Sequence, residues 1–319
     1  MEETLCPLCQ ERKKAKIWTE TQTGKYPFTY RQCCSCGFVF LDPRPDEEEI
    51  LQYYAQDYYG EGSHKFRSCF EGFRLFFARK RMRRTQKFFP CPGKALDIGC
   101  GQGTFLQLLK EEGWDCHGTE LTKESAFRAS QKGIPVSVGE VQEGQFTPHF
   151  FDLISFWQVL EHLPDPMKVL KALRPFLKKE GIIAISTPNI ESLQAKVSTR
   201  RWFHLDPPRH LCLFSPETLE RMMRSLGFSL VEIRHFSMEQ NPYGWLQSLM
   251  NILADSNNLL YMNLKNNPSL TRQRLPRLGQ VKMFLLAAGL SPFCLFLSLT
   301  MAMFECGDTI EAYFRLEEA

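Results

Sequence analysis

The feature that most constrains this 319-residue chain is a short apolar run that leads into closely spaced glycines. Residues 95–103 read Ala-Leu-Asp-Ile-Gly-Cys-Gly-Gln-Gly, and an amphipathic stretch begins at Thr104. Glycine is needed where a turn demands a positive φ, or where a ligand approaches the backbone too closely for a Cβ atom. Since the first N–H groups of the following helix would face such a ligand, this strand–loop–helix unit predicts a ligand-binding site.

The spacing of these glycines argues against a dinucleotide-binding loop. That loop has the pattern G-x-G-x-x-G, whose third glycine would fall on Thr104. The glycines here alternate instead, at Gly99, Gly101 and Gly103. An acid, Asp97, lies two residues before the first of them, and Glu120 follows the last by seventeen residues. Glu120 would end the next strand, where an acid can accept hydrogen bonds from both hydroxyls of a ribose.

From Lys94 onward, short apolar runs alternate with amphipathic ones, as in a parallel sheet covered by helices. Strands are predicted at 95–98, 116–120, 135–138, 151–155, 181–186, 230–235 and 309–316. Helices are predicted at 104–112, 123–132, 166–177 and 216–226. The pattern stops for about seventy residues between Phe236 and Thr309. Because connections usually have roughly 4–6 residues, an insertion is predicted there.

Five motifs in this order make the chain resemble the class I S-adenosylmethionine-dependent methyltransferases. The matching residues are 96–103, 118–120, 151–154, 159–163, and 181–183 with 186–189. They cover roughly residues 90–236, and the terminal strand completes the match. The resemblance implies an α/β fold: a Rossmann-like seven-stranded sheet with an antiparallel last strand, helices on both faces, and S-adenosylmethionine as the cofactor.

The resemblance also implies which residues would hold that cofactor. They are Asp97, Gly99, Gly101, Gly103, Glu120, Glu140 and Gln158. The glycines would pass under the methionine part, Asp97 would lie near its ammonium, and Glu120 would bind the ribose. Glu140, after the third strand, would lie near the adenine, although the family more often has Asp or Asn there. Gln158, after the fourth strand, would meet the cofactor's carboxylate or the substrate.

Two of the seven histidines are candidates for catalysis. Methyl transfer from a sulfonium needs a base only where the acceptor is protonated, and histidine suits that task near neutral pH. His162 follows the fourth strand, at the sheet edge where ligands bind in such folds. His210 lies in a Pro-Arg-His stretch that resembles one found in many small-molecule methyltransferases of this type. For both, the alternative is a structural role as a helix cap or a partner of a backbone carbonyl. Trp157 would contact the sulfonium or the substrate, or else pack in the core.

The N-terminal region contains two C-x-x-C knuckles about two dozen residues apart. Their thiols predict a tetrahedral zinc site with the ligands Cys6, Cys9, Cys33 and Cys36. Cys34 is then a spare thiol, and an iron–sulfur cluster or a lost metal is the alternative. With short strands predicted at 16–19 and 29–32, the region resembles a zinc ribbon. Similar modules precede the core of sugar C-methyltransferases and of some ribosomal RNA methyltransferases, so the module does not choose a substrate.

The insertion contains an uncharged apolar run, 283–304, that is long enough to span a bilayer at roughly twenty residues. Gly289, Ser291 and Pro292 are predicted to break it into two halves. We therefore expect a helical hairpin, which lies in the membrane interface or covers an apolar substrate pocket. A buried helical cap or a dimer contact is the alternative. Basic residues that would meet anionic lipid, or form solvated helix faces, are Arg79, Lys80, Arg81, Arg83, Arg84, Arg272, Arg274, Arg277 and Lys282.

Composition narrows the functional class. A hydrophobic content of 43% excludes a disordered or fibrous chain, and a net charge of +3 gives little reason to expect a nucleic-acid partner. The first residues lack the basic-then-apolar run of a secretory signal, so we expect a cytoplasmic protein, with peripheral membrane contact if 283–304 binds lipid. In that compartment the twelve cysteines favour metal binding or packing over disulfides.

The predicted organisation has four parts. They are a zinc ribbon at 1–45, a helical linker or lid at 46–92, a methyltransferase core at 93–236 and 307–319, and the apolar insertion at 237–306. The acids of 46–49 would open one linker helix, and a second is predicted from His64 to Phe89. Because the central motifs resemble those of ubiquinone-pathway O-methyltransferases, the favoured function is O-methylation of a small, lipid-soluble or carrier-linked acceptor. The alternatives are sugar C-methylation, RNA methylation, and a non-catalytic zinc-ribbon interaction protein with a degenerate methyltransferase fold.

Overall fold

The computed structural model describes residues 3–11, 15–23, 26–46, 49–50, 71–142, 144–255, 258–264 and 275–317. The chain forms two compact units, each built from three segments. The first unit contains Met1–Gly72, Pro188–Pro216 and His235–Thr309, and the second contains Phe73–Thr187, Glu217–Arg234 and Ile310–Ala319. The sequence-based division differs chiefly at 188–216, which it placed within the core. A short strand in that segment pairs with the N-terminal sheet and so ties the segment to the first unit.

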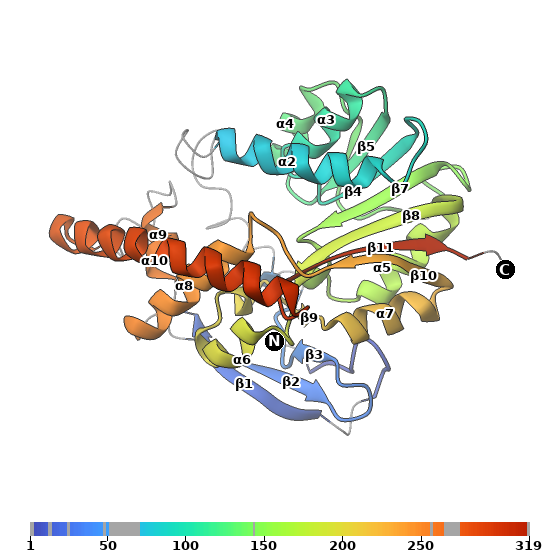
Figure 1. Cartoon of the computed structure of the whole chain (residues 1–319). Helices are drawn as coiled ribbons and strands as arrows, with labels where there is room; N and C mark the ends of the chain where they lie inside the picture. Colours follow the sequence, from blue (N-terminus) through green and yellow to red (C-terminus); the bar gives the residue numbers. More distant parts are fainter. Residues whose placement is uncertain are drawn as a thin grey trace. The chain divides into compact units, whose positions relative to one another are not determined.

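The second unit is built on a seven-stranded sheet, which confirms the predicted fold class (Figure 1). Its strands are β4 (Lys94–Ile98), β5 (Asp115–Glu120), β6 (Val136–Val138), β7 (Phe151–Trp157), β8 (Leu177–Pro188), β10 (Phe228–Arg234) and β11 (Thr309–Leu316). Their order across the sheet is β10-β11-β8-β7-β4-β5-β6. The strands from β8 to β6 run parallel, and β11 pairs antiparallel with β10. The carboxyl ends of the parallel strands therefore share one edge of the sheet.

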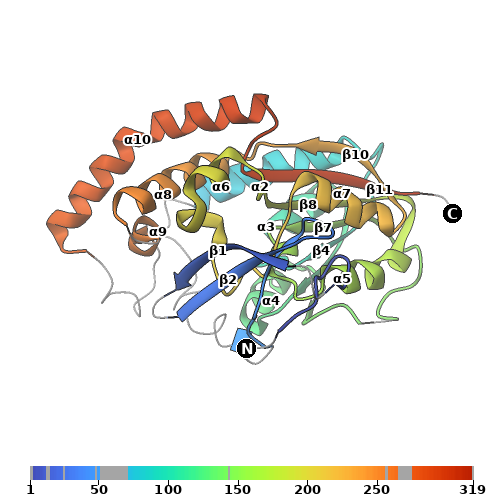
Figure 2. The ribbon, with the colours of Figure 1, turned by 90° about the horizontal axis from the view of Figure 1, so that it is seen from below.

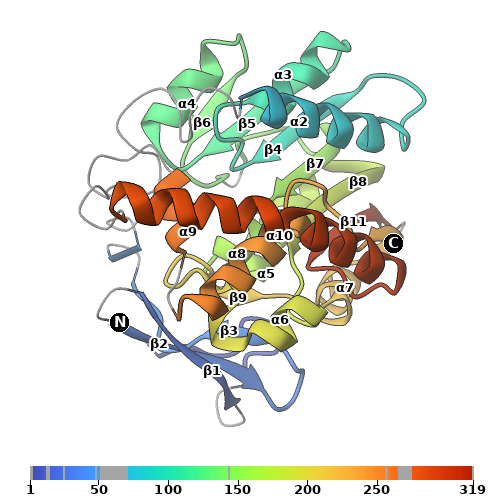
Figure 3. The same cartoon turned by 60° about the vertical axis from the view of Figure 1, so that its left-hand side comes forward.

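Helices flank this sheet (Figures 1 and 3). They are α2 (Glu71–Gln86), α3 (Thr104–Glu111), α4 (Lys123–Ser130), α5 (Pro166–Leu173) and α7 (Pro216–Ser225). The apolar residues of α3 recur at helical spacing, and Phe105, Leu106 and Leu109 are buried. Helix α5 is shorter than predicted because Pro175 cannot donate a backbone hydrogen bond, and a 3-10 turn follows at Arg174–Phe176.

The predicted linker is only partly described. At its start, Asp46 and Glu49 form a reciprocal capping box, in which each backbone N–H donates to the other residue's carboxylate, at 3.1 and 2.9 Å. Helix α2 occupies most of the predicted helix 64–89, whereas residues 51–70 lie outside the described part of the chain. Within the second unit, an ion pair of 2.5 Å between Arg84 and Glu311 joins α2 to β11.

The first unit contains a small sheet with the order β1-β2-β3-β9. Its strands are β1 (Ala15–Thr23), β2 (Tyr26–Cys33), β3 (Val39–Leu41) and β9 (Cys212–Leu213). The antiparallel β1–β2 hairpin confirms the two predicted N-terminal strands, which are longer than expected. The buried hydroxyl of Tyr30 donates a hydrogen bond of 2.7 Å to the carbonyl of His210, and so holds the Pro-Arg-His segment against the sheet. This unit also contains the helices α6 (Leu193–Ser198), α8 (Asn241–Leu253) and α9 (Leu259–Leu264).

The predicted break in the apolar run is wrong. A single helix, α10 (Arg277–Met303), runs through all 27 residues with Pro292 inside it, and Figure 2 shows that it bends along its length. Proline removes one intrahelical hydrogen bond and tilts the axis, but helix-forming residues on both sides keep the helix continuous. The expected hairpin is therefore one long helix. Of the basic residues predicted beside it, Arg272 and Arg274 lie outside the described residues.

Candidate active site and metal centre

The glycine loop joins β4 to α3 in the second unit, and all three glycines have left-handed backbone. Their φ angles are +64° at Gly99, +56° at Gly101 and +69° at Gly103. A Cβ on Gly99 would lie 2.7 Å from Val159, and one on Gly103 would lie 2.9 Å from Ala129, so packing alone requires glycine there. A Cβ on Gly101 would have no atom within 4 Å. The loop therefore borders open space at its middle glycine.

Glu120 fixes this loop to the end of β5. Its buried carboxylate accepts a hydrogen bond of 2.8 Å from the N–H of Gly101 and another of 3.2 Å from the N–H of Thr122. The N–H of Cys100 adds a hydrogen bond of 2.9 Å to the carbonyl of Thr119. The predicted ribose acceptor is thus in direct contact with the predicted cofactor loop.

Asp97 lies buried on β4, directly opposite Ser155 of β7 in the sheet register. The Ser155 hydroxyl donates a hydrogen bond of 2.6 Å to its carboxylate. Burial nevertheless raises the pKa of Asp97 to about 7, although Ser155 and the Arg81 guanidinium favour the ionised form. A cation bound beside this carboxyl would shift it toward the carboxylate.

Arg81 and Trp157 form a contact that the sequence did not predict. The guanidinium of Arg81 lies 4.7 Å from the centroid of the Trp157 ring, at a distance typical of a cation–π interaction. Trp157 also packs edge-on against Phe105, with ring centroids 5.3 Å apart. The indole therefore has the packing role given above as the alternative. Arg81 contacts this indole and does not serve only as a cation that could face lipid.

Gln158 and Glu140 follow the carboxyl ends of β7 and β6. Gln158 has a φ of +58°, and its N–H donates to the Ser186 carbonyl at 2.8 Å while its side-chain amide donates to the Ser186 hydroxyl at 3.0 Å. Glu140 is exposed, and the N–H of Gly139 before it bonds the carbonyl of Glu120 at 2.9 Å. Both predicted positions lie at the sheet edge that carries the glycine loop, so the structure brings the seven predicted cofactor residues to one edge.

His162 lies in a 3-10 turn (Leu160–His162) just after β7, and its side chain is half-buried. Its neighbour Glu161, which the sequence analysis included only as part of a motif, has a distinctive environment in the structure. Glu161 is buried, accepts a hydrogen bond of 3.0 Å from Thr187, and has no partner for its other oxygen among the described residues. Burial raises the pKa of Glu161 to about 8. The signal for it was an acid four residues after the end of a buried strand, at the carboxyl edge of the sheet.

His210 belongs to the first unit, whereas His162 belongs to the second. The His210 ring is buried, and its Nδ1 lies 2.7 Å from the carbonyl of His204. Since a carbonyl only accepts hydrogen bonds, Nδ1 carries the proton. Burial lowers the pKa of His210 to about 4, which keeps the ring neutral near pH 7. One ring nitrogen thus has the structural role given as the alternative, and catalysis by either histidine stays a prediction.

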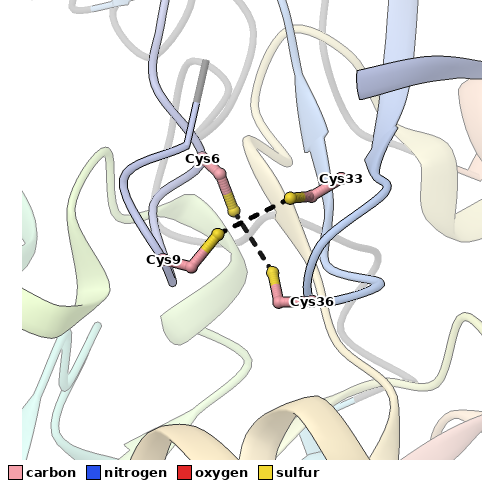
Figure 4. A group of neighbouring side chains, drawn as sticks. All are labelled: Cys6, Cys9, Cys33 and Cys36. Carbon is pink, nitrogen blue, oxygen red and sulfur yellow. Dashed lines mark hydrogen bonds between the residues drawn. The ribbon is translucent and has the colours of Figure 1, made fainter. Parts of the chain in front are cut away.

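The four predicted metal ligands form one cluster in the first unit (Figure 4). The Sγ atoms of Cys6 and Cys36 are 3.5 Å apart, those of Cys9 and Cys33 are 3.6 Å apart, and all four lie within 4.8 Å of one another. Zinc–sulfur bonds of about 2.3 Å place the sulfurs of a tetrahedral site about 3.8 Å apart, which fits this cluster. Cys34 is exposed and is not a member of it.

Comparison with known proteins identifies the family. Residues 70–233, just over half of the chain, match the family described as "Methyltransferase domain". The chain belongs to this family, and its fold and motifs make it a class I S-adenosylmethionine-dependent methyltransferase.

Individual relatives extend this result. A ubiquinone biosynthesis O-methyltransferase of Photorhabdus laumondii subsp. laumondii is 34% identical over 103 residues, which cover 30% of this chain and 43% of that protein. A protein of the same name from Chromobacterium violaceum is 28% identical over 169 residues, covering 49% of this chain and 72% of that protein. The chain spans less than half the length of the first curated relatives. The crystal structure of the [4+2]-cyclase SpnF shares the fold, with a TM-score of 0.52 and 14% identity over 86% of this chain and 98% of that one.

Proposed function

We propose that this methyltransferase transfers a methyl group to an oxygen of a small, lipid-soluble or carrier-linked acceptor. The observation that carries the cofactor assignment is the open position at Gly101, whose N–H is held by Glu120 on the adjacent strand. The names of the relatives from two bacteria support oxygen as the acceptor atom. Sugar C-methylation and RNA methylation are the competing functions.

When bound, S-adenosylmethionine would supply the methyl group. The left-handed glycine loop would let the methionine part pass close to the backbone, while Asp97 would pair with its ammonium and Glu120 would accept the ribose hydroxyls. Glu140 and Gln158 lie at the same sheet edge. Glu140 would contact the adenine of the cofactor, and Gln158 would contact its carboxylate. The chain thereby orients the sulfonium for an in-line displacement.

An oxygen acceptor that begins as a hydroxyl must lose its proton as the new carbon–oxygen bond forms and the carbon–sulfur bond breaks. His162 is the residue of the second unit that we propose to accept this proton, because it is half-buried at the carboxyl edge of β7. His210, the other catalytic candidate, is neutral near pH 7, and its Nδ1 is bonded to the carbonyl of His204. Substitution of either residue by Ala should reduce methyl transfer without loss of cofactor affinity.

The acceptor class can be tested with radiolabelled S-adenosylmethionine and the purified full chain. Three extracts are offered in parallel: an apolar lipid extract, a nucleotide-sugar fraction and total RNA. We expect label to enter the lipid extract in a base-stable, ether-linked form. Label in the sugar fraction or in RNA would contradict the proposal and select the competing function.

We also propose that Cys6, Cys9, Cys33 and Cys36 hold a structural zinc ion. Burial raises the pKa of the thiols of Cys6 and Cys36, the latter to about 11, so a bound dication is what would keep these sulfurs ionised. The site lies at the end of the β1–β2 hairpin, where it would fix two turns of a sheet with a small core.

A further inference from the structure

Helix α10 buries a few, mostly small residues and exposes most of its large apolar residues. Four of its 27 residues are buried: Met283, Ala287, Cys294 and Ser298. At 3.6 residues per turn, these four fall within about 60° of the helix circumference. Three of the four have small side chains, so a narrow, closely packed stripe attaches the helix to the first unit.

The exposed surface of the same helix is apolar. Leu285, Phe296 and Met303 are 69%, 64% and 83% exposed. The other large apolar residues that are exposed on α10 and at its end are Leu278, Val281, Phe284, Leu286, Phe293, Leu299 and Phe304. Together they cover about 200° of the helix circumference. A surface helix of a soluble globular protein has the opposite arrangement, with its large apolar residues facing the core.

Helix α8, which packs against α10, buries several polar side chains. Met250 of α8 and Leu260 of α9 pack with Met283 and Ala287, and Figures 1 and 3 show α10 lying along α8. On α8, Gln247, Ser248 and Asn251 are buried. The side chain of Gln247 donates to Asn251 at 2.7 Å, and Ser248 accepts from a backbone N–H at 3.0 Å. Helix α8 therefore holds buried, hydrogen-bonded polar groups, whereas the exposed surface of α10 is apolar.

The charge of this region is one-sided. No Asp or Glu occurs in residues 256–304, between Asp255 and Glu305, whereas the segment has five basic residues. Two of these, Arg277 and Lys282, lie in the first two turns of α10. A basic end followed by an apolar surface complements an anionic headgroup layer above acyl chains.

We propose that α10 lies in the interface of an anionic lipid bilayer, with its exposed apolar surface immersed and its N-terminal cations among the headgroups. The helix is long and apolar enough to cross a membrane, and it is the one such helix among the described residues. Its packing along α8 indicates that α10 lies in the interface and does not span the bilayer, because a spanning helix would carry the buried amides of α8 into the bilayer. A single helix packed against α10 would cover only a narrow strip of its surface, whereas a bilayer would cover the whole exposed apolar surface. The inference does not depend on the methyl acceptor.

Co-sedimentation of the full chain with vesicles tests this proposal. Vesicles of phosphatidylcholine mixed with phosphatidylglycerol should pellet the protein. Phe296→Asp should weaken this binding by roughly tenfold or more, because a carboxylate is costly among acyl chains. Phe127→Asp is the matched control, since Phe127 lies on α4 of the other unit and is 62% exposed. Binding by the control should equal that of the unaltered protein.

The cations are tested separately. Arg277→Gln and Lys282→Gln should each weaken binding to the anionic vesicles by roughly fivefold, and leave binding to pure phosphatidylcholine unchanged. Cofactor affinity, measured by calorimetry on every variant, should not change and so reports that the fold is intact.

Three results would overturn the proposal. The first is that the unaltered protein does not bind anionic vesicles. The second is that Phe296→Asp binds them as well as Phe127→Asp does. The third is that every variant binds anionic and pure phosphatidylcholine vesicles equally. If sedimentation in lipid-free buffer instead shows a dimer that Phe296→Asp converts to a monomer, with no vesicle binding, a second copy of the chain covers α10.

Discussion

Gly101 differs from its two neighbouring glycines, because only its Cβ position is open. We expect Gly101→Arg to abolish S-adenosylmethionine binding while the fold persists, since the new side chain would fill the space that the ligand needs. Left-handed backbone costs a non-glycine residue about 1–2 kcal/mol, which a stable unit tolerates. Titration calorimetry and circular dichroism measure the two effects.

The matched control is Gly113→Arg. Gly113 is exposed, has a φ of +90°, and precedes β5 at the opposite edge of the sheet. This variant has the same kind of backbone cost and should keep full cofactor affinity. Retained affinity in Gly101→Arg would contradict the assignment of the site.

The carboxyl of Asp97 makes stability depend on pH. Its pKa is about 7 in the folded protein against an ordinary 3.8, so the folded form holds a proton that the unfolded form releases between these values. Stability therefore falls as pH rises through this window, by up to about 1.4 kcal/mol per pH unit. We expect denaturant unfolding of the unaltered protein to lose stability relative to Asp97→Asn between pH 5 and 7. A difference that stays constant across that range would contradict this origin.

At the scale of single elements, local signals were sufficient for most of the sheet. The limits of β11 coincide with the predicted strand, and α7 begins at Pro216 as its capping signals indicate. Strand β9 has only two residues and is defined by pairing with β3, about 170 residues earlier, so no local pattern marks it. Pro292 misled the prediction of α10, because sequence alone does not show whether a proline ends a helix or bends it.

The cysteine cluster predicts how the N-terminal sheet responds to metal removal. Cys36→Ser should lose bound zinc, measured by mass spectrometry of the intact protein, and should deprotect the β1–β2 amides in hydrogen exchange. Cys34→Ser is the control, because this exposed thiol is outside the cluster. Equal zinc content in the two variants would refute the ligand set.

The buried stripe of α10 can be probed with two serines that make the same kind of bond. Ser298 is buried and Ser291 is exposed, and each hydroxyl donates 2.7 Å to the carbonyl four residues earlier. Ser298→Leu should cost about 1–3 kcal/mol of unfolding free energy by overpacking, and Ser291→Leu less than about 0.5 kcal/mol. Denaturant melts compare them. Equal effects would show that the stripe is not closely packed.

For the whole molecule, the sequence predicted site residues at the ends of the parallel strands better than site residues that reach the strands from other elements. Asp97 and Glu120 were predictable because the ends of parallel strands meet at one edge. Arg81 was not, since it reaches Trp157 from a helix outside the motifs, and the raised pKa of Glu161 depends on burial that no motif encodes. The division of residues 188–216 depends on long-range strand pairing as well.

Strand β11 lies inside the large sheet, between β10 and β8, although it comes last in the sequence. Removal of residues 309–319 should therefore leave β10 without a partner and one edge of β8 unpaired, and it also removes Glu311, the partner of Arg84. We expect this truncated protein to be insoluble or unfolded in size-exclusion chromatography. Truncation after Glu317 should elute as the full chain does. A soluble, cofactor-binding product of the longer deletion would contradict a structural role for β11.

The interleaving of the two units also bears on biosynthesis. Cys6, Cys9, Cys33 and Cys36 are synthesised before the strand that completes their sheet, which follows after residue 211. One edge of β8 stays unpaired until β11 has emerged, at residue 316. A nascent chain thus exposes unpaired strand edges until β9 and β11 have been made, and such edges are prone to aggregation.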